Sequence, residues 1–153
     1  MLYMADRMSL EKTGQPIIGG RLCAMDYGPV HSEVHDLIKG GNADQKQWSM
    51  HFANNSFYVH LATDPGVAAL SRYEIGVLGD LSQKYMGYDD WDVASETLKF
   101  PEYVQAHDGK NGPPIAISLE RLIEAVGRGP DKAKITSNAR EKAFFDELFS
   151  VKS

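Results

Sequence analysis

Residues 27–38 read YGPVHSEVHDLI, and their chemistry changes from that of a turn to that of a helix within a few positions. Proline fixes φ and glycine allows a tight approach of the backbone, so Gly28 and Pro29 predict a rigid turn. Apolar residues then recur at helical spacing, which predicts a helix from about residue 31 to residue 39. The stretch therefore predicts a scaffold corner that leads directly into a helix.

The segment before this corner predicts one helix and one strand. Residues 2–13 mix apolar and charged side chains, and Gly14 followed by Pro16 is typical of a helix end. Residues 21–26, RLCAMD, alternate polar and apolar side chains, which favours a short strand that runs into the corner.

The segment after the corner predicts a hairpin. Alternating stretches at 49–53 and 56–62 flank Asn54 and Asn55. Asparagine tolerates the left-handed conformations that tight turns need, so the turn is expected at these two residues.

The best-marked helix begins after Leu70. Ser71 and Glu74 have the spacing of a capping box, in which each side chain bonds the other residue's backbone N–H. Gly76 and Gly79 lie inside this helix, where glycine costs about 1 kcal/mol relative to alanine, so we expect close packing there. Further helices are expected at about 90–97, 118–126 and 137–149.

These elements predict a mainly helical α+β fold. We expect five to six helices around a small antiparallel sheet made by residues 21–26, 49–53 and 56–62. At 153 residues the chain is expected to form a single domain, residues 1–153, in which 115–149 is a helical C-terminal extension.

Composition narrows the functional classes. Apolar residues are 42% and charged residues 24% of the chain, as in ordinary globular proteins. No apolar run approaches the roughly 20 residues that would span a bilayer, and the first residues lack the layout of a signal peptide. Cys23 is the only cysteine, which fits a reducing cytoplasm. The net charge of −5 argues against nucleic acid as partner and favours a basic one.

No catalytic set can be assembled from the sequence motifs. His31 and His35 are four residues apart beside Asp36, which suits a metal or hydrolase site, but no glutamate stands between them in the hydrolase pattern. Surface or structural roles are the favoured reading, and no cofactor or metal is expected. The two tryptophans are read as core or interface anchors, and Asp89, Asp90 and Asp92 as complements of a helix dipole.

Three stretches together resemble the Panacea domain of SocA-type antitoxins: LYMADR at 2–7, GQPIIGGRLCAMDYGPVHSEVHDLI at 14–38 and LSRYEI at 70–75. In that family a tyrosine-containing first helix ends in a Gly-x-Pro segment, followed by a short strand, Tyr-Gly-Pro-Val and a helix. The resemblance covers roughly residues 2–107. The positions that match the family's pattern are Tyr3, Asp6, Pro16, Tyr27, Gly28, Pro29, Val30, Leu70, Ser71 and Thr97.

The chain also departs from the family's pattern. Leu98 stands where the family often has histidine, and Tyr103 where it often has tryptophan. The family's leading helix is absent before LYMADR, so either the start is truncated or segment 115–149 replaces that helix. Without such cover, we expect apolar surface on the first helix near Leu2, Tyr3 and Met4.

The resemblance implies a non-enzymatic antitoxin that binds and neutralises a cognate protein toxin encoded nearby, often in a prophage. It leaves open direct inhibition or delivery to a cellular protease, and it leaves open a homo-oligomer. The alternative is a winged-helix-like DNA-binding autoregulator, in which the helix after the corner and the hairpin act as recognition helix and wing. The residues expected to contact the partner are Tyr3, Asp6, Tyr27, Gly28, Pro29, His31 and Glu33.

Overall fold

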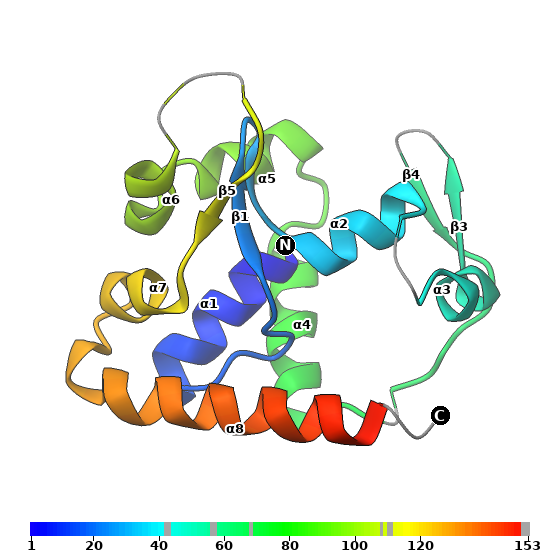
Figure 1. The fold of residues 1–153 in the computed structure, drawn as a ribbon. Coiled ribbons are helices and arrows are strands. Elements are labelled where there is room, and N and C mark those ends of the chain that lie inside the picture. Colours follow the sequence, from blue (N-terminus) through cyan, green and yellow to red (C-terminus); the bar gives the residue numbers. More distant parts are fainter. Residues whose placement is uncertain (42–43, 56–57, 68, 108, 110–111, 151–153) are drawn as a thin grey trace.

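The computed structural model describes residues 1–41, 44–55, 58–67, 69–107, 109 and 112–150 (Figure 1). The helices in these residues are α1 (Leu2–Thr13), α2 (Ser32–Lys39), α3 (Gln45–His51), α4 (Arg72–Lys84), α5 (Asp90–Thr97), α6 (Pro101–Ala106), α7 (Leu119–Ala125) and α8 (Lys132–Ser150), with a 3₁₀ turn at Gly129–Asp131. The strands are β1 (Leu22–Met25), β2 (Gly28–His31), β3 (Phe52–Asn55), β4 (Tyr58–Leu61) and β5 (Ile115–Ile117). The predicted mainly helical α+β class is confirmed, and α3 and α6 raise the helix count above the expected five to six.

The strands form two separate antiparallel sheets, so the single sheet expected from the sequence is wrong. The first has the order β2-β1-β5, with Leu22 paired to His31 on one side and to Ile117 on the other. The second is the β3–β4 hairpin. Pairing with β5 joins positions more than 90 residues apart, and alternation within a short segment cannot reveal such a partner.

The predicted hairpin lies close to its expected place, but its details differ. Residues 49–51 belong to helix α3, and Asn54 and Asn55 lie inside β3 rather than in a turn. Residues 56–57, which connect β3 to β4, lie outside the described residues.

The corner at Gly28 and Pro29 also differs from its prediction. Both residues lie in β2, and the chain reverses at Asp26 and Tyr27, which separate the paired residues Met25 and Gly28. Among the described strands, β2 is at the edge of its sheet. A proline is tolerated on an edge strand because its missing N–H need not serve a second neighbour.

Helix α1 lies at the centre of the molecule (Figure 1). Tyr3 and Leu10 join one core cluster with side chains of the first sheet, α6 and α7. Met4 and Ala5 join a second cluster with side chains of α4. Tyr3 and Met4 are therefore buried and only Leu2 is exposed, so most of the apolar surface expected near these three residues is covered, partly by α7.

Helix α4 confirms one local prediction and contradicts another. The Ser71 side chain accepts from the Glu74 N–H while Glu74 accepts from the Ser71 N–H, which completes the capping box. The prediction of close packing at Gly76 and Gly79 is wrong, because both are exposed and a Cβ at either would meet no described atom within 4 Å.

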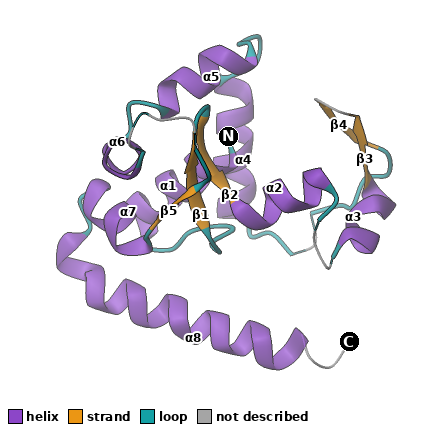
Figure 2. Ribbon diagram, turned by 45° about the horizontal axis from the view of Figure 1, so that its top comes forward, coloured by secondary structure: helices purple, strands orange, loops and turns teal. Residues whose placement is uncertain are grey.

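Helix α2 leads away from this centre to α3 and the β3–β4 hairpin (Figures 1 and 2). Helix α8 runs along the bottom of the molecule in both views, and Ile135 near its start joins the core cluster of Tyr3 and Leu10. Helix α8 begins at Lys132, five residues before its expected start at 137.

Candidate functional site

Asp6 anchors the segment that precedes the corner. Its side chain is fully buried on α1, and its two oxygens accept three backbone N–H groups, from Ile17 at 2.8 Å, Ile18 at 2.7 Å and Gly19 at 2.8 Å. Hydrogen bonds to a carboxylate are stronger than those between neutral groups. A single side chain thus fixes the path by which the chain leaves α1 and enters β1.

His31 ties the end of β2 to the same anchor. Its Nδ1 lies 3.0 Å from the Gly19 carbonyl oxygen, which can only accept, so Nδ1 carries a proton. Its Nε2 faces Asp6 Oδ2 at 3.5 Å, too far for a good hydrogen bond but within range of an ion pair. Because this ring is buried, His31 has a structural place in the fold.

Glu102 is a second buried anchor, on α6. Its Oε1 accepts from the Tyr3 hydroxyl at 3.1 Å and from Arg7 Nε at 2.9 Å. The Arg7 guanidinium also lies over the Phe100 ring, 4.5 Å from its centroid. These contacts hold α6 against the first two turns of α1.

Burial, and then the Glu102 carboxylate, raise the pKa of Tyr3 above its usual range. Below about pH 10 both folded and unfolded chains keep this proton, and above it only the folded chain does. The free energy of unfolding should therefore fall as pH rises above about 10, and Tyr3→Phe should remove part of that fall. Urea midpoints between about pH 8 and pH 11 test this.

Tyr58→Phe, on the exposed face of β4, is the matched control for Tyr3→Phe. In both variants the free energy of unfolding should still fall in part as pH rises, because burial also raises the pKa of Tyr85 and of Tyr103. Equal pH slopes in the two variants would contradict the role of Tyr3.

Gly28 is required where α5 crosses β2. Its φ is +125°, and a Cβ placed there would lie 2.6 Å from Thr97 Oγ1. Thr97 donates its hydroxyl to the Ala94 carbonyl at 2.7 Å, so this side chain is held in position. The glycine of the corner thus serves a close contact between β2 and α5.

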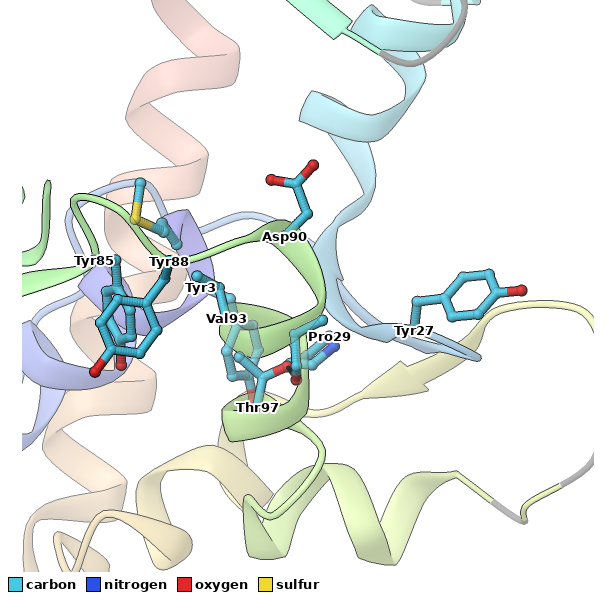
Figure 3. A pocket seen from close by; sticks show the side chains of 10 residues that line it. Tyr3, Tyr27, Pro29, Tyr85, Tyr88, Asp90, Val93 and Thr97 are labelled. Atoms are coloured by element: carbon cyan, nitrogen blue, oxygen red, sulfur yellow. Dashed lines mark hydrogen bonds between the residues drawn. The ribbon is translucent and has the colours of Figure 1, made fainter.

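A pocket of about 320 Å³ opens beside this contact. Figure 3 shows Tyr85 and Tyr88 lying together on one side of it and Tyr27 on the other, with the Tyr27 ring directed away from the pocket. Asp90 also lines it. The pocket is therefore rich in aromatic side chains that come from three separate segments of the chain.

The exposed aromatic side chains near this pocket belong to two separate ring pairs. Tyr27 is 71% exposed and Trp91 is 66% exposed, and their rings meet edge to face at 5.2 Å. Tyr88, 52% exposed, packs edge to face on the buried Tyr85 at 5.5 Å. We call Tyr27, Tyr88 and Trp91 the aromatic rim.

The residues predicted to contact a partner fall into two groups. Tyr3, Asp6, Gly28, Pro29 and His31 are buried, so in this structure they hold the corner together. The role of these five residues in partner binding stays a prediction. The same holds for the other two residues, which are more accessible.

Those two accessible residues are Tyr27 and Glu33. Tyr27 lies on the aromatic rim. Glu33 is half-buried, and its carboxylate accepts hydrogen bonds from the backbone N–H and from the guanidinium of Arg21. This contact helps to keep the start of α2 next to β1.

Sequence reasoning did not place Tyr88 and Trp91 at this site. A signal was present in residues 85–92, YMGYDDWD, where three aromatic and three acidic side chains gather at the connection from α4 to the first turn of α5. The acidic residues were read as helix-start residues, and Asp89 does cap α5 by accepting from the Asp92 N–H at 2.8 Å.

A second apolar surface lies on the C-terminal part of α8. Its exposed side chains are Phe144, Phe145, Leu148 and Phe149. Rings of Phe145 and Phe149 stack at 6.4 Å along the helix.

The fold and the corner define a class: a mainly helical α+β scaffold whose N-terminal helix is fastened to a strand corner by buried polar anchors. Residues 1–102 match the model of one such family, described as Antitoxin SocA-like, Panacea domain. The chain belongs to this family, as its resemblance predicted, and membership supports a role of the toxin–antitoxin type. No curated protein and no solved structure matches the chain.

Two further properties concern the described part of the chain. It contains no helix long and apolar enough to cross a membrane. It also contains no group of three or more His, Cys, Asp or Glu side chains arranged to hold a metal ion.

Proposed function

We propose that this protein is a non-enzymatic antitoxin that binds and neutralises a protein toxin encoded beside it. The observation that carries the proposal is the family match over residues 1–102. The aromatic rim supports it, because exposed tyrosine and tryptophan side chains next to a pocket are the usual anchors of a protein interface.

The toxin would bind at the aromatic rim, with Tyr27 as the contact from the corner. The buried anchors Asp6 and His31 would then act indirectly, by holding β1 and β2 against α1. This assignment separates side chains that touch the toxin from side chains that position them.

We propose further that residues 1–153 act as one domain, with 115–149 as its C-terminal extension. Three contacts support this: β5 pairs with β1, Leu122 and Ile123 join the core cluster of Tyr3, and Arg128 binds the end of α1. The Arg128 side chain donates to the Glu11 carbonyl at 2.9 Å and to the Lys12 carbonyl at 2.7 Å.

Co-expression with the neighbouring open reading frame tests the proposed function. The neighbouring product should stop growth when expressed alone, and this protein should restore growth and co-purify with it. If the neighbour is harmless alone, or stays toxic when both are present, the proposal is wrong.

Within that assay, Tyr27→Ala and Trp91→Ala should each weaken toxin binding by at least about tenfold, because each removes an aromatic anchor and exposes its ring partner. Tyr58→Ala is the matched control, since Tyr58 is about as exposed but lies on the β3–β4 hairpin. Affinity and thermal midpoint are measured together, so that loss of binding is separated from loss of fold.

If both rim variants stay folded and bind like the parent, the interface lies elsewhere. The exposed face of α8 would then be the next surface to test.

The alternative of a DNA-binding autoregulator stays untested. Its recognition helix would be α2, which has one lysine (Lys39), no arginine and two acids (Glu33 and Asp36), a poor composition for phosphate contacts. A gel shift with the protein's own promoter at moderate salt separates the two functions, because sequence-selective binding by this protein alone would favour DNA.

A further inference from the structure

The β3–β4 hairpin is a two-stranded sheet that stands apart from the centre of the molecule (Figure 1). Every side chain of β4 is exposed, and Tyr58 and Leu61 are 64% and 59% exposed. A hairpin of two strands is only marginally stable by itself, and it gains stability from a third strand or from a packed face. Helix α3 supplies part of this support to β3, since Trp48 stacks on Phe52 with the ring centroids 4.3 Å apart.

The register of the hairpin indicates which backbone groups of β4 point outward. The Ala62 N–H donates to the His51 carbonyl at 2.8 Å, so these two residues form a hydrogen-bonded pair. Bonded and non-bonded pairs alternate along an antiparallel ladder, and counting back from Ala62 makes Leu61 and Val59 the non-bonded residues. Their N–H and C=O groups therefore point away from β3, and they form no hydrogen bond with another residue in the described part of the chain.

Two helices hold the corresponding edge of β3. The Phe52 N–H donates to the Trp48 carbonyl, where α3 ends. The Asn54 side chain donates to the Leu37 and Ile38 carbonyls at the end of α2, at 3.2 and 2.7 Å. The edge of β4 is therefore the side of the hairpin on which another strand can be added.

The edge of β4 carries neither charge nor proline. Exposed edges are normally blunted by charged side chains or proline, or covered by another element. Residues 52–55 and 58–63 contain no Asp, Glu, Lys, Arg or Pro. In the other sheet, by contrast, the edge strand β2 carries Pro29 and packs against α1 and α5. The exposed edge of β4 thus favours the addition of a further strand.

The charge of the chain indicates which strand is added. Two copies of this chain, each with a net charge of −5, repel one another, so they approach most readily where acidic side chains are absent. The strands of the hairpin provide such a surface. Strand β4 is also complementary to itself, because antiparallel pairing about a two-fold axis places Val59 of each copy opposite Leu61 of the other.

We propose that two copies of this chain associate through β4, in antiparallel pairing about a two-fold axis that passes beside His60. Val59 and Leu61 then exchange backbone hydrogen bonds across the axis, and the two hairpins become one continuous sheet. The two copies of His60 face each other as a non-bonded pair. The pairing uses the edge of the strand and leaves the faces of the sheet in solvent. Such a dimer does not depend on the toxin.

Sedimentation equilibrium of the full chain measures the association. The parent should pass from monomer to dimer between about 5 µM and 0.5 mM, as expected for a small interface. Val59→Lys combined with Leu61→Lys should weaken dimerisation at least about tenfold, because like charges then face each other across the axis. Val59→Lys combined with Leu61→Glu should restore part of the affinity, because opposite charges then face each other.

Val104→Lys is the matched control, because Val104 is 58% exposed on α6 and its replacement should leave dimerisation unchanged. Circular dichroism of each variant, at a concentration where the chain is monomeric, shows whether the fold is kept.

His60→Cys tests the position of the axis. The Cα atoms of a non-bonded antiparallel pair are about 4.5 Å apart, a distance that a disulfide can bridge. With oxidised glutathione, His60→Cys should form a disulfide-linked dimer at least about tenfold faster than Tyr88→Cys, an exposed position on the aromatic rim. The parent, whose only cysteine is the half-buried Cys23, gives the background rate.

A parent chain that stays monomeric up to about 0.5 mM would overturn the proposed dimer. The same conclusion would follow if the dimer survived Val59→Lys with Leu61→Lys unweakened, or if His60→Cys and Tyr88→Cys cross-linked at equal rates.

Discussion

Asp6→Ala is expected to lower the free energy of unfolding by about 4 kcal/mol, a large share of the roughly 5–15 kcal/mol that stabilises an ordinary domain. The substitution removes the acceptor of three part-buried backbone N–H groups at 2.7–2.8 Å, and it also removes the carboxylate that faces the buried ring of His31. Chemical denaturation followed by circular dichroism measures the effect.

Glu11→Ala is the matched control, because Glu11 is an exposed acid on the same helix and its loss should change stability by less than about 0.5 kcal/mol. The stability of Asp6→Asn should lie between those of Asp6→Ala and Glu11→Ala. Asparagine keeps one acceptor oxygen but turns a donor toward one of the backbone N–H groups. If Asp6→Ala were as stable as Glu11→Ala, the anchoring role of Asp6 would be refuted.

Gly28→Ala is expected to cost about 3 kcal/mol, from two sources that can be separated. A φ of +125° strains any residue with a Cβ, and that Cβ would also lie 2.6 Å from Thr97 Oγ1. Thr97→Ala removes the hydroxyl, so the double variant should be more stable than the sum of the two single changes by about 1 kcal/mol or more.

Gly127→Ala measures the cost of a milder positive φ without a clash, because Gly127 has φ +77° and a Cβ there would meet no described atom within 4 Å. It should cost about 1 kcal/mol. Additive effects of Gly28→Ala and Thr97→Ala would contradict the contact between β2 and α5.

Several features could be read from the sequence because their causes lie within a few residues. The capping box of Ser71 and Glu74 and the end of α1 at Gly14, with φ +77°, join near neighbours. Helix α5 was expected at 90–97 and is found there, with Asp89 as its cap. Such contacts need no distant partner, so local pattern is sufficient.

The candidate site could be predicted only in part. The sequence and its resemblance to a family singled out Tyr27, Gly28 and Pro29, and the structure places all three beside the pocket or its contact with α5. They could not tell that Tyr27 is exposed while Tyr3 is buried, because each outcome depends on elements elsewhere in the chain.

What the sequence by itself determined is therefore the helices other than α3 and α6, the capping box of α4, the mainly helical class and the family. The tertiary structure alone decided which strands pair, since β1 takes β5 as its second neighbour from across more than 90 residues. It also decided that Gly28 is needed against Thr97, and that Tyr27 meets Trp91. The physical reason is that such contacts form only when long segments of chain are brought together, and no local pattern records which segments will meet.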